Sequence, residues 1–193
     1  MPKIVLMMSV SLDGYIEGPD HDISWHRVDE ELHQHMNDYI RTLGGLLGGR
    51  RVHQVMADYW PTADSDPDAS PITVEFAGIW RDLPKVVYSR TLEKADWNTT
   101  VVREVVPEEV EALKARADGD LGLGGAELAA TFLRLGLVDE FRIYVHPTLV
   151  GRGTRLFPED DDLAASLRLV ESHTFGNGVV LLRYERENNS AQS

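Results

Sequence analysis

The segment from Leu121 to Leu128 constrains the fold most, because an apolar run passes through two glycines directly into a helical pattern. This order is typical of a strand, a tight turn and the start of a helix. Gly124 and Gly125 would let a ligand approach the main chain closely, since glycine carries no Cβ and reaches positive φ. The N–H groups of the first helical turn would then suit a phosphate. The alternative is that the two glycines only tighten the connection.

A second junction of this kind lies at Gly49, where the apolar pair at 46–47 is followed by glycine and then by a helical pattern. Arg50 and Arg51 stand at the expected helix start, so charge and the helix dipole could hold a phosphate there together. The glycines at 44 and 49 have the spacing of a P-loop. Arginines occupy the places where that motif requires Lys and Ser or Thr, which excludes a Walker site.

A third candidate site follows the apolar strand pattern of residues 84–89. Ser89, Arg90 and Thr91 end this strand, and ligands of open α/β sheets gather at the carboxyl ends of strands. The formal net charge of −13 disfavours nucleic acid as a partner and repels polyphosphates at long range. An anionic cofactor must therefore find local cations, which Arg90 and the arginine pair after Gly49 are placed to supply.

The composition is that of a soluble globular protein, with 42% hydrophobic and 26% charged residues in a chain of 193. We expect one domain over residues 1–187 and a polar, disordered tail over residues 188–193. No apolar run reaches about 18 residues, the length of a membrane span, and Asp13 and Glu17 argue against a signal peptide. The cytoplasm is therefore the expected location. Cysteine is absent, which excludes disulfides and thiolate chemistry.

The helical pattern that begins after Asp29 contains two histidines, His33 and His35. Asp29 is placed to cap this helix, in which apolar residues recur at helical spacing. Residues two apart point to different helix faces, so the histidines cannot chelate one metal ion, and we expect no metal site. Residues 62–71, rich in Asp, Ser and Pro, are expected to form an exposed loop.

The C-terminal part of the chain predicts a β-hairpin, because strand patterns at 167–174 and 179–185 flank the turn residues 175–178. The first strand pattern, residues 3–10, is apolar throughout, which is typical of a central strand buried on both faces. No glycine-rich turn follows it, and the segment around Gly125 lacks the third glycine of the dinucleotide fingerprint, so a Rossmann fold fits poorly. A mixed sheet with an antiparallel edge is favoured.

The order of these segments resembles the dihydrofolate reductase-like superfamily, and most closely the branch that contains the reductase domain of bifunctional riboflavin-biosynthesis enzymes. The motifs that carry this resemblance span nearly the whole chain. They are SLDGYI, LLGGRR, KVVYSRTL, LGLGGAELAATFLRLGLVDEF and HPTLVGRGTRLF, followed by the final hairpin strand. The resemblance implies a three-layer αβα fold of the α/β class, whose mixed, mostly parallel central sheet has about eight strands and an antiparallel C-terminal strand. It also implies NADPH as the hydride donor.

The resemblance also assigns cofactor contacts by position. It implies that three strand ends hold the phosphates and that a cis peptide bond often joins the paired glycines. The residues at the pyrophosphate and the 2′-phosphate would be Gly49, Arg50, Arg51, Ser89, Arg90 and Thr91. The residues along the pyrophosphate and the nicotinamide would be Leu123, Gly124, Gly125, Ala126 and Glu127, with Ser9 and Ile16 flanking the nicotinamide. Val52 stands where the family often has threonine, which removes one hydroxyl ligand of the phosphate.

Two carboxylates are candidate catalytic residues on the substrate side. Glu30 lies five residues after Trp25, and in dihydrofolate reductases a carboxylate at that spacing supports protonation of the substrate. A carboxyl group that faces an apolar pocket can act as a general acid. The simpler alternative is that Glu30 only stabilises the helix dipole. Asp13 is the second candidate, although an Asp-Gly turn has a structural explanation of its own.

Together these features predict an NADPH-dependent reductase that transfers hydride to a small heterocyclic or carbonyl substrate, similar to dihydrofolate or to a riboflavin precursor. Two alternatives stay open: a non-catalytic NADP-binding protein of the same fold, and a pocket that binds some other anion. The expected partner is a small-molecule substrate, with neither nucleic acid nor a membrane involved. The apolar strands near the C-terminus and the family resemblance favour a homodimer.

Overall fold

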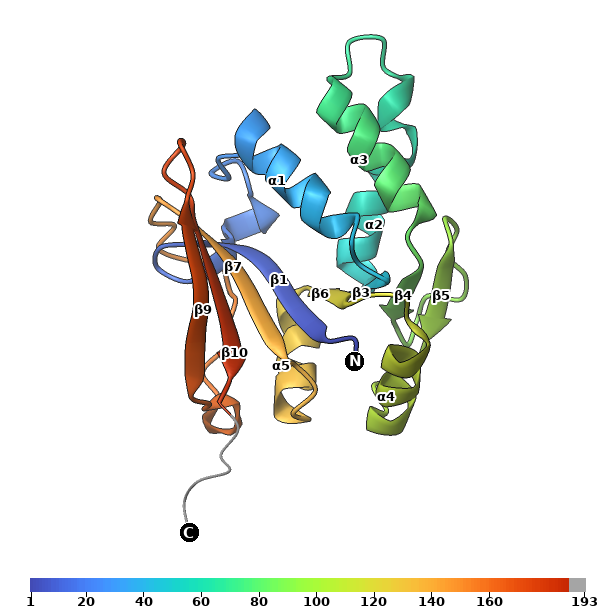
Figure 1. Ribbon diagram of the computed structural model, residues 1–193, viewed down its shortest axis with the longest axis vertical. Helices are drawn as coiled ribbons and strands as arrows, with labels where there is room; N and C mark the ends of the chain where they lie inside the picture. The colour runs from blue at the N-terminus through green and yellow to red at the C-terminus, as the bar shows by residue number, and fades with distance from the viewer. Residues whose placement is uncertain (188–193) are drawn as a thin grey trace.

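Eight strands form one sheet in the computed structural model, which describes residues 1–187 (Figure 1). These strands are β1 (Ile4–Ser11), β3 (Gly45–Gly49), β4 (Lys85–Tyr88), β5 (Thr99–Val102), β6 (Leu121–Gly124), β7 (Glu140–His146), β9 (Leu167–Thr174) and β10 (Val180–Arg186). Their order is β5-β4-β3-β6-β1-β7-β10-β9. The strands from β5 to β7 are parallel, whereas β10 pairs antiparallel with both β7 and β9. The predicted tail, residues 188–193, lies outside the described residues.

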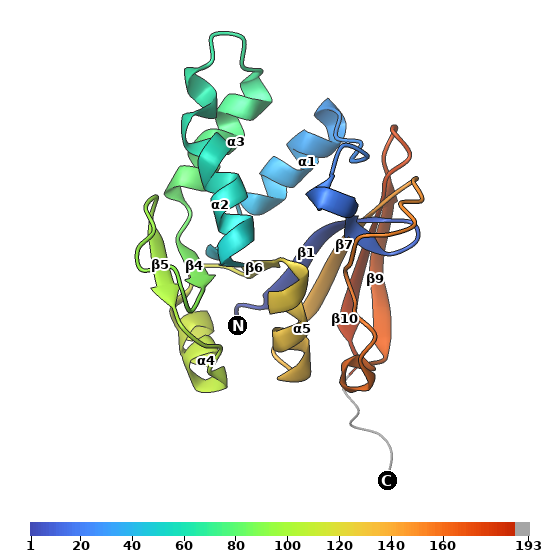
Figure 2. The same ribbon diagram turned by 180° about the vertical axis from the view of Figure 1, so that it is seen from behind.

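Helices cover both faces of this sheet, as Figures 1 and 2 show. One face carries α1 (Glu30–Ile40), α2 (Arg50–Tyr59) and α3 (Pro71–Asp82), and the other carries α4 (Pro107–Arg116) and α5 (Ala126–Arg134). Short 3-10 turns occur at η1 (Pro19–His21), η2 (Trp60–Ser65) and η3 (Asp161–Leu163). The three layers, the mixed sheet and the antiparallel C-terminal strands confirm the predicted fold class.

The central strand β1 is buried on both faces, as its uninterrupted apolar pattern predicts. Ile4 and Leu6 belong to a core that reaches α5, where Phe132 is fully buried. On the opposite face, Ile40 of α1 packs with Trp80 of α3. Burial of these side chains on both sides of one sheet supplies the main driving force for folding.

The start of α1 follows the sequence-based expectation. The carboxylate of Asp29 caps the helix by accepting a main-chain N–H of the first turn at 3.0 Å. His33 lies against Phe76 of α3, whereas His35 lies against Tyr144 of β7. The two histidines therefore point in different directions, as their spacing predicts.

The structure contains one local feature that the sequence does not predict and one that differs from the prediction. A small second sheet pairs β2 (Tyr15–Glu17) with β8 (Thr154–Arg155), and no sequence pattern predicted it. The exposed loop expected over residues 62–71 is wrong in part, because η2 buries Ala63 to 6% exposure. Arg81 of α3 holds this segment in place through an ion pair with Asp64 at 2.7 Å.

The sheet ends in a long, open edge strand. Almost every residue of β9 is exposed, including Leu169 and Val170. Such an edge offers unpaired main-chain groups to another chain, which is compatible with the expected homodimer. The homodimer itself stays a prediction.

Within residues 1–187, none of the helices combines the length and the apolar character needed to cross a bilayer.

Candidate functional site

The carboxyl ends of β4, β3, β6, β1 and β7 lie along one edge of the sheet, because these neighbouring strands are parallel. We call this the carboxyl edge. Gly48 of β3 lies opposite Gly124 of β6. α2 begins at this edge with Gly49 as its N-cap, and α5 begins there with Gly125. The structure therefore brings two helix N-termini together, and their N–H groups and dipoles favour an anion.

Gly125 lies close to side chains of two other elements at the carboxyl edge, Met8 of β1 and Val52 of α2. Its φ of 94° favours glycine, and its peptide bond with Gly124 is trans, not the cis bond that the family resemblance implies. Its N–H donates to Met8 Sδ at 3.3 Å. A Cβ added to Gly125 would lie only 3.2 Å from Val52 Cγ2. The backbone angle therefore favours glycine at this position, and a larger residue would also press on the Val52 side chain.

The two arginines at the start of α2 have different surroundings. Arg51 Nη2 donates to Glu17 Oε2 at 3.0 Å, and Glu17 also accepts from Thr154 Oγ1 at 2.7 Å. Glu17 thereby ties α2 to the β2–β8 sheet and would compete with a phosphate for Arg51. Arg50 is exposed, and within residues 1–187 its side chain has neither an ion pair nor a hydrogen bond. Its guanidinium is free to meet a ligand.

The turn after β4 is held by its own hydrogen bonds. Ser89 Oγ accepts the N–H groups of Thr91 and Leu92 at 3.3 and 3.0 Å. Arg103 Nη1 donates to the main-chain carbonyls of Ser89 and Leu92 at 3.0 and 2.7 Å. The Ser89 hydroxyl is thus engaged in the turn, while Arg90 and Thr91 are exposed beside it. This arrangement fixes the main chain that presents Arg90.

Ser9 lies on β1, the strand between β6 and β7, and Ile16 lies on the short strand β2. Ser9 of β1 stands opposite Tyr144 of β7 and is half-buried. Ile16 of β2 packs against the core that contains Leu156. β2 follows β1 after a tight turn, so both residues belong to the part of the carboxyl edge next to β7.

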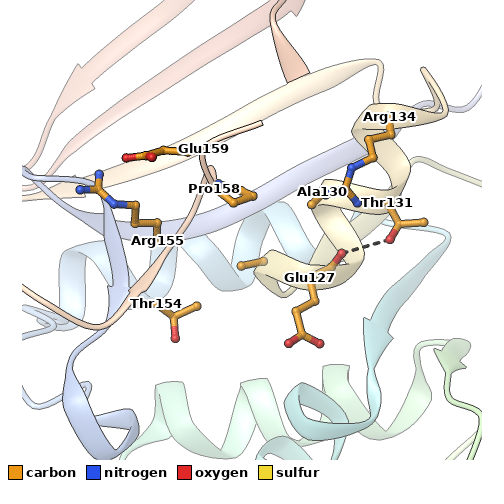
Figure 3. A pocket seen from close by; sticks show the side chains of 9 residues that line it. Glu127, Ala130, Thr131, Arg134, Thr154, Arg155, Pro158 and Glu159 are labelled. Carbon is orange, nitrogen blue, oxygen red and sulfur yellow. Dashed lines mark hydrogen bonds between the residues drawn. The ribbon is translucent and has the colours of Figure 1, made fainter. Parts of the chain in front are cut away.

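A pocket of about 590 Å³ opens beside α5 (Figure 3), and we call it the polar pocket because charged side chains belong to its lining. Figure 3 shows α5 on one side of it and the β8 segment on the other. Arg134 Nε pairs with Asp160 at 2.7 Å, and the guanidinium of Arg155 lies 5.1 Å from the ring centre of Tyr15. The lining residues are Ala126, Glu127, Ala130, Thr131, Arg134, Thr154, Arg155, Pro158 and Glu159. Charges of both signs therefore surround a space continuous with the N-terminus of α5.

An apolar cavity of about 220 Å³ lies between the sheet and α1, α2 and α3. Gly124 and Met8 belong to its lining, so the cavity reaches the carboxyl edge. Besides the indole of Trp80, polar side chains in this lining are those of His53 and Lys85. The cavity and the polar pocket thus adjoin the same glycine turn from two sides.

The sequence matches the model of one protein family along most of its length. Residues 2–181 match the RibD C-terminal domain. The chain belongs to this family. Two relatives of this RibD C-terminal domain protein come from Bacillus subtilis (strain 168). The uncharacterized protein YyaP is 34% identical over 183 residues, 94% of each chain, and the uncharacterized protein YwjB is 28% identical over 184 residues, 93% of this chain and 95% of its own.

Solved structures share the fold of this RibD C-terminal domain protein. A putative riboflavin biosynthesis protein from Shewanella sp. PV-4 superposes with a TM-score of 0.72 at 21% identity, over 96% of this chain and 99% of its own. A dihydrofolate reductase from Enterococcus faecalis complexed with NADP(H) gives a TM-score of 0.65 at 15% identity, over 96% and 97%. These likenesses show that the chain shares the fold of dihydrofolate reductase, and the match to the RibD C-terminal domain confirms the predicted family branch.

Asp13 has a structural role in this RibD C-terminal domain protein. Its carboxylate accepts from Ser11 Oγ at 2.6 Å and from the N–H groups of Val150 and Gly151 at 3.0 and 2.7 Å. These hydrogen bonds, that of Ser11 first, lower the pKa of Asp13 to about 2. An ionised carboxylate with its oxygens engaged is a poor proton donor, so the contacts disfavour the catalytic role that was predicted for it.

Glu30 lies in the first turn of α1 and is exposed. It lines neither the polar pocket nor the apolar cavity. Its neighbour Glu31 accepts the N–H of Gly176 at 2.9 Å, which ties α1 to the C-terminal hairpin. The position of Glu30 agrees with the simpler alternative of a helix-start carboxylate, and its catalytic role stays a prediction.

Asp13→Asn is expected to lower the melting temperature at neutral pH, because an amide would present a donor to three groups that all donate. The measurement is thermal unfolding, compared with Asp118→Asn at an exposed position. A variant that kept the wild-type melting temperature but lost all turnover would instead assign Asp13 to proton transfer.

Sequence reasoning missed three residues that shape this site. Met8 contacts the Gly125 N–H, Arg103 holds the Ser89 turn, and Glu17 pairs with Arg51. The local sequence around Met8 and Glu17 indicates only a strand and a turn. Nothing in the local sequence around Arg103 indicates contact with a turn that precedes it by more than ten residues.

Proposed function

We propose that this chain is an NADPH-dependent reductase that transfers hydride to a small carbonyl or heterocyclic acceptor. One observation supports this most: the N-termini of α2 and α5 and the turn after β4 share the carboxyl edge, with Arg50, Arg51 and Arg90 beside them. Phosphates of a dinucleotide match such a set of N–H groups and guanidiniums. Gly125 has a positive φ and carries no Cβ, which suits a close main-chain contact with a ligand.

When bound, NADPH would supply the hydride. The chain would supply binding and orientation, because hydride transfer depends mainly on holding cofactor and acceptor together. In this proposal Gly49 to Arg51 bind the pyrophosphate, and Leu123 to Glu127 line the pyrophosphate and the nicotinamide. Arg90 binds the 2′-phosphate, and Ser9 and Ile16 flank the nicotinamide. The acceptor lies in the apolar cavity, on the side of Gly124 that faces α2.

A non-catalytic NADP-binding protein is the second candidate. It is favoured by the surroundings of the two predicted acids, since Asp13 is held by hydrogen bonds and Glu30 is exposed outside both pockets. The two candidates differ in one outcome. The reductase oxidises NADPH when a suitable acceptor is added, whereas the binding protein holds NADPH without turnover.

The cofactor proposal predicts that NADPH binds more tightly than NADH and that Arg90→Ala removes this preference. Loss of a charge-assisted contact with the 2′-phosphate should weaken NADPH roughly ten- to a hundredfold and leave NADH unchanged. Isothermal titration calorimetry measures both affinities. Arg116→Ala is the matched control, because this exposed arginine ends α4 shortly before β6 begins, at the opposite edge of the sheet.

Two results would count against this assignment. A preference for NADPH that survives in Arg90→Ala would place the 2′-phosphate elsewhere. Absence of NADPH binding by the wild-type chain would overturn the cofactor proposal as a whole.

A further inference from the structure

The apolar cavity is poorly suited to a charged acceptor. Among the described residues that line it, Lys85 carries the one ammonium group, and this group is already engaged: Nζ donates to the carbonyls of Trp80 and Leu83 at 2.5 and 2.7 Å. The same Nζ lies 4.3 Å from the centre of the Trp80 ring. Its donors are therefore directed at the protein. No guanidinium belongs to the lining among the described residues. A buried phosphate would remain without a counter-ion, which is costly.

His53 is the polar group of the cavity that has hydrogen-bonding capacity to spare. It is 9% exposed, and its ring centre lies 6.0 Å from that of Trp80, with 29° between the two ring planes. Within residues 1–187 no hydrogen bond of its ring is found. Burial, followed by the charge of Lys85, lowers the pKa of His53, which favours the neutral ring. A neutral imidazole offers one N–H donor and one acceptor nitrogen.

The cavity also meets the proposed cofactor site directly. Met8 lines the cavity, and its Sδ accepts the Gly125 N–H at 3.3 Å. Val52 lines it too, and a Cβ added to Gly124 or Gly125 would lie 4.0 or 3.2 Å from the Val52 side chain. An acceptor in the cavity would therefore lie next to the glycine turn at which the cofactor is proposed to bind. The volume of about 220 Å³ is below that of pockets for drug-sized ligands, so the acceptor must be small.

We propose that the acceptor is a small, planar, uncharged compound with a conjugated carbonyl group, held in the apolar cavity with its oxygen hydrogen-bonded to His53. This inference rests on the proposed reductase function and specifies its substrate class. The acceptor gains a hydride from the cofactor at carbon and a proton from solvent at oxygen, so it is reduced by two electrons while the dihydronicotinamide is oxidised. Acceptors that carry a phosphate, such as the phosphoribosylaminouracil named for a Thermotoga maritima enzyme of similar fold, are disfavoured.

Three probes of nearly the same shape test this inference. Menadione has two fused rings and conjugated carbonyls, methylnaphthalene lacks the carbonyls, and naphthoquinone sulfonate adds a negative charge. Cysteine thiols add to quinones, but this chain has no cysteine, so binding is free of that side reaction. Calorimetric titration without cofactor is expected to show menadione binding about tenfold more tightly than either of the other two probes.

The role of His53 is tested with His53→Leu, an apolar replacement that suits a helix. This variant should bind menadione and methylnaphthalene equally well and should keep the wild-type affinity for NADPH. The control is His33→Leu, at a half-buried histidine of α1 that lies outside the cavity lining and should keep the wild-type discrimination.

Three results would overturn the inference: no binding of menadione, equal binding of the sulfonate, or preserved discrimination in His53→Leu. Each of these results can be distinguished from a failure of the proposed reductase function, because the titrations contain no cofactor. If menadione binds as expected and NADPH is not oxidised in its presence, the cavity assignment holds and the reductase proposal fails.

Discussion

Gly153→Ala is expected to lower the free energy of unfolding by about 3 kcal/mol, the top of the range for a strained backbone position. Gly153 has a φ of 138°, which L side chains rarely adopt. An added Cβ would lie 2.1 Å from the carbonyl oxygen of Glu17 and 2.8 Å from Gly18 Cα. Both are main-chain atoms that no rotamer change can move, so the β2–β8 sheet would have to separate. Urea unfolding at neutral pH measures the loss.

Gly151→Ala is the matched control for this prediction. Gly151 also has a positive φ, of 80°, but a Cβ there would meet no atom within 4 Å. Gly151→Ala is therefore expected to lower the free energy of unfolding only by the cost of a positive φ at alanine, about 1 kcal/mol. If the two variants lost equal stability, the close approach of Gly153 to the strand of Glu17 would be refuted.

The wild-type protein is expected to lose stability steeply between pH 6.5 and pH 4, and His146 is the main predicted source. This residue at the end of β7 is fully buried and stacks on His26 with ring centres 5.1 Å apart. Burial, with smaller contributions from His26 and Arg27, lowers the pKa of His146 to about 4. In the unfolded chain a histidine has a pKa of about 6.5.

The direction of this effect follows from proton binding. Between pH 6.5 and pH 4 the unfolded state binds a proton at His146 that the folded state does not, so acid favours unfolding. The contribution is intact above pH 6.5 and is lost as the pH falls to about 4, by roughly 3 kcal/mol in all. Measuring the free energy of unfolding in urea at a series of pH values gives the slope.

His146→Asn should flatten this slope. The asparagine amide oxygen can accept the Arg27 N–H that His146 Nδ1 accepts at 3.0 Å, yet it does not titrate. His173→Asn, at an exposed histidine of β9, should keep the wild-type slope. Parallel curves for wild type and His146→Asn would show that the acid sensitivity originates elsewhere.

The sequence predicted most of the fold because its signals are local. Asp29 caps the helix that follows it, the glycines at 176 and 178 stand in the hairpin turn, and the apolar run after Lys3 forms a buried central strand. Each of these patterns reports a preference of a few neighbouring residues. The strand-glycine-helix junctions were likewise visible in the sequence, and parallel pairing then placed their ends at one edge.

The details of the candidate site were less predictable because they depend on distant contacts. Thr154 and Glu17 are 137 residues apart, yet their hydrogen bond joins β2 to β8. Asp13 has the appearance of a simple turn residue, but its partners at Val150 and Gly151 become visible only in three dimensions. A strand of two or three residues has no periodicity to detect, so the second sheet was missed.

The central claim is that NADPH binds along the carboxyl edge, and amide chemical-shift mapping tests it most directly. When NADPH is titrated into the isotope-labelled protein, saturable shifts are predicted for amides at 49–52, 89–92 and 124–128. The amides of β9, at the far end of the sheet, should not move. Saturable shifts confined to segments outside the carboxyl edge, or no shifts at all, would contradict the claim.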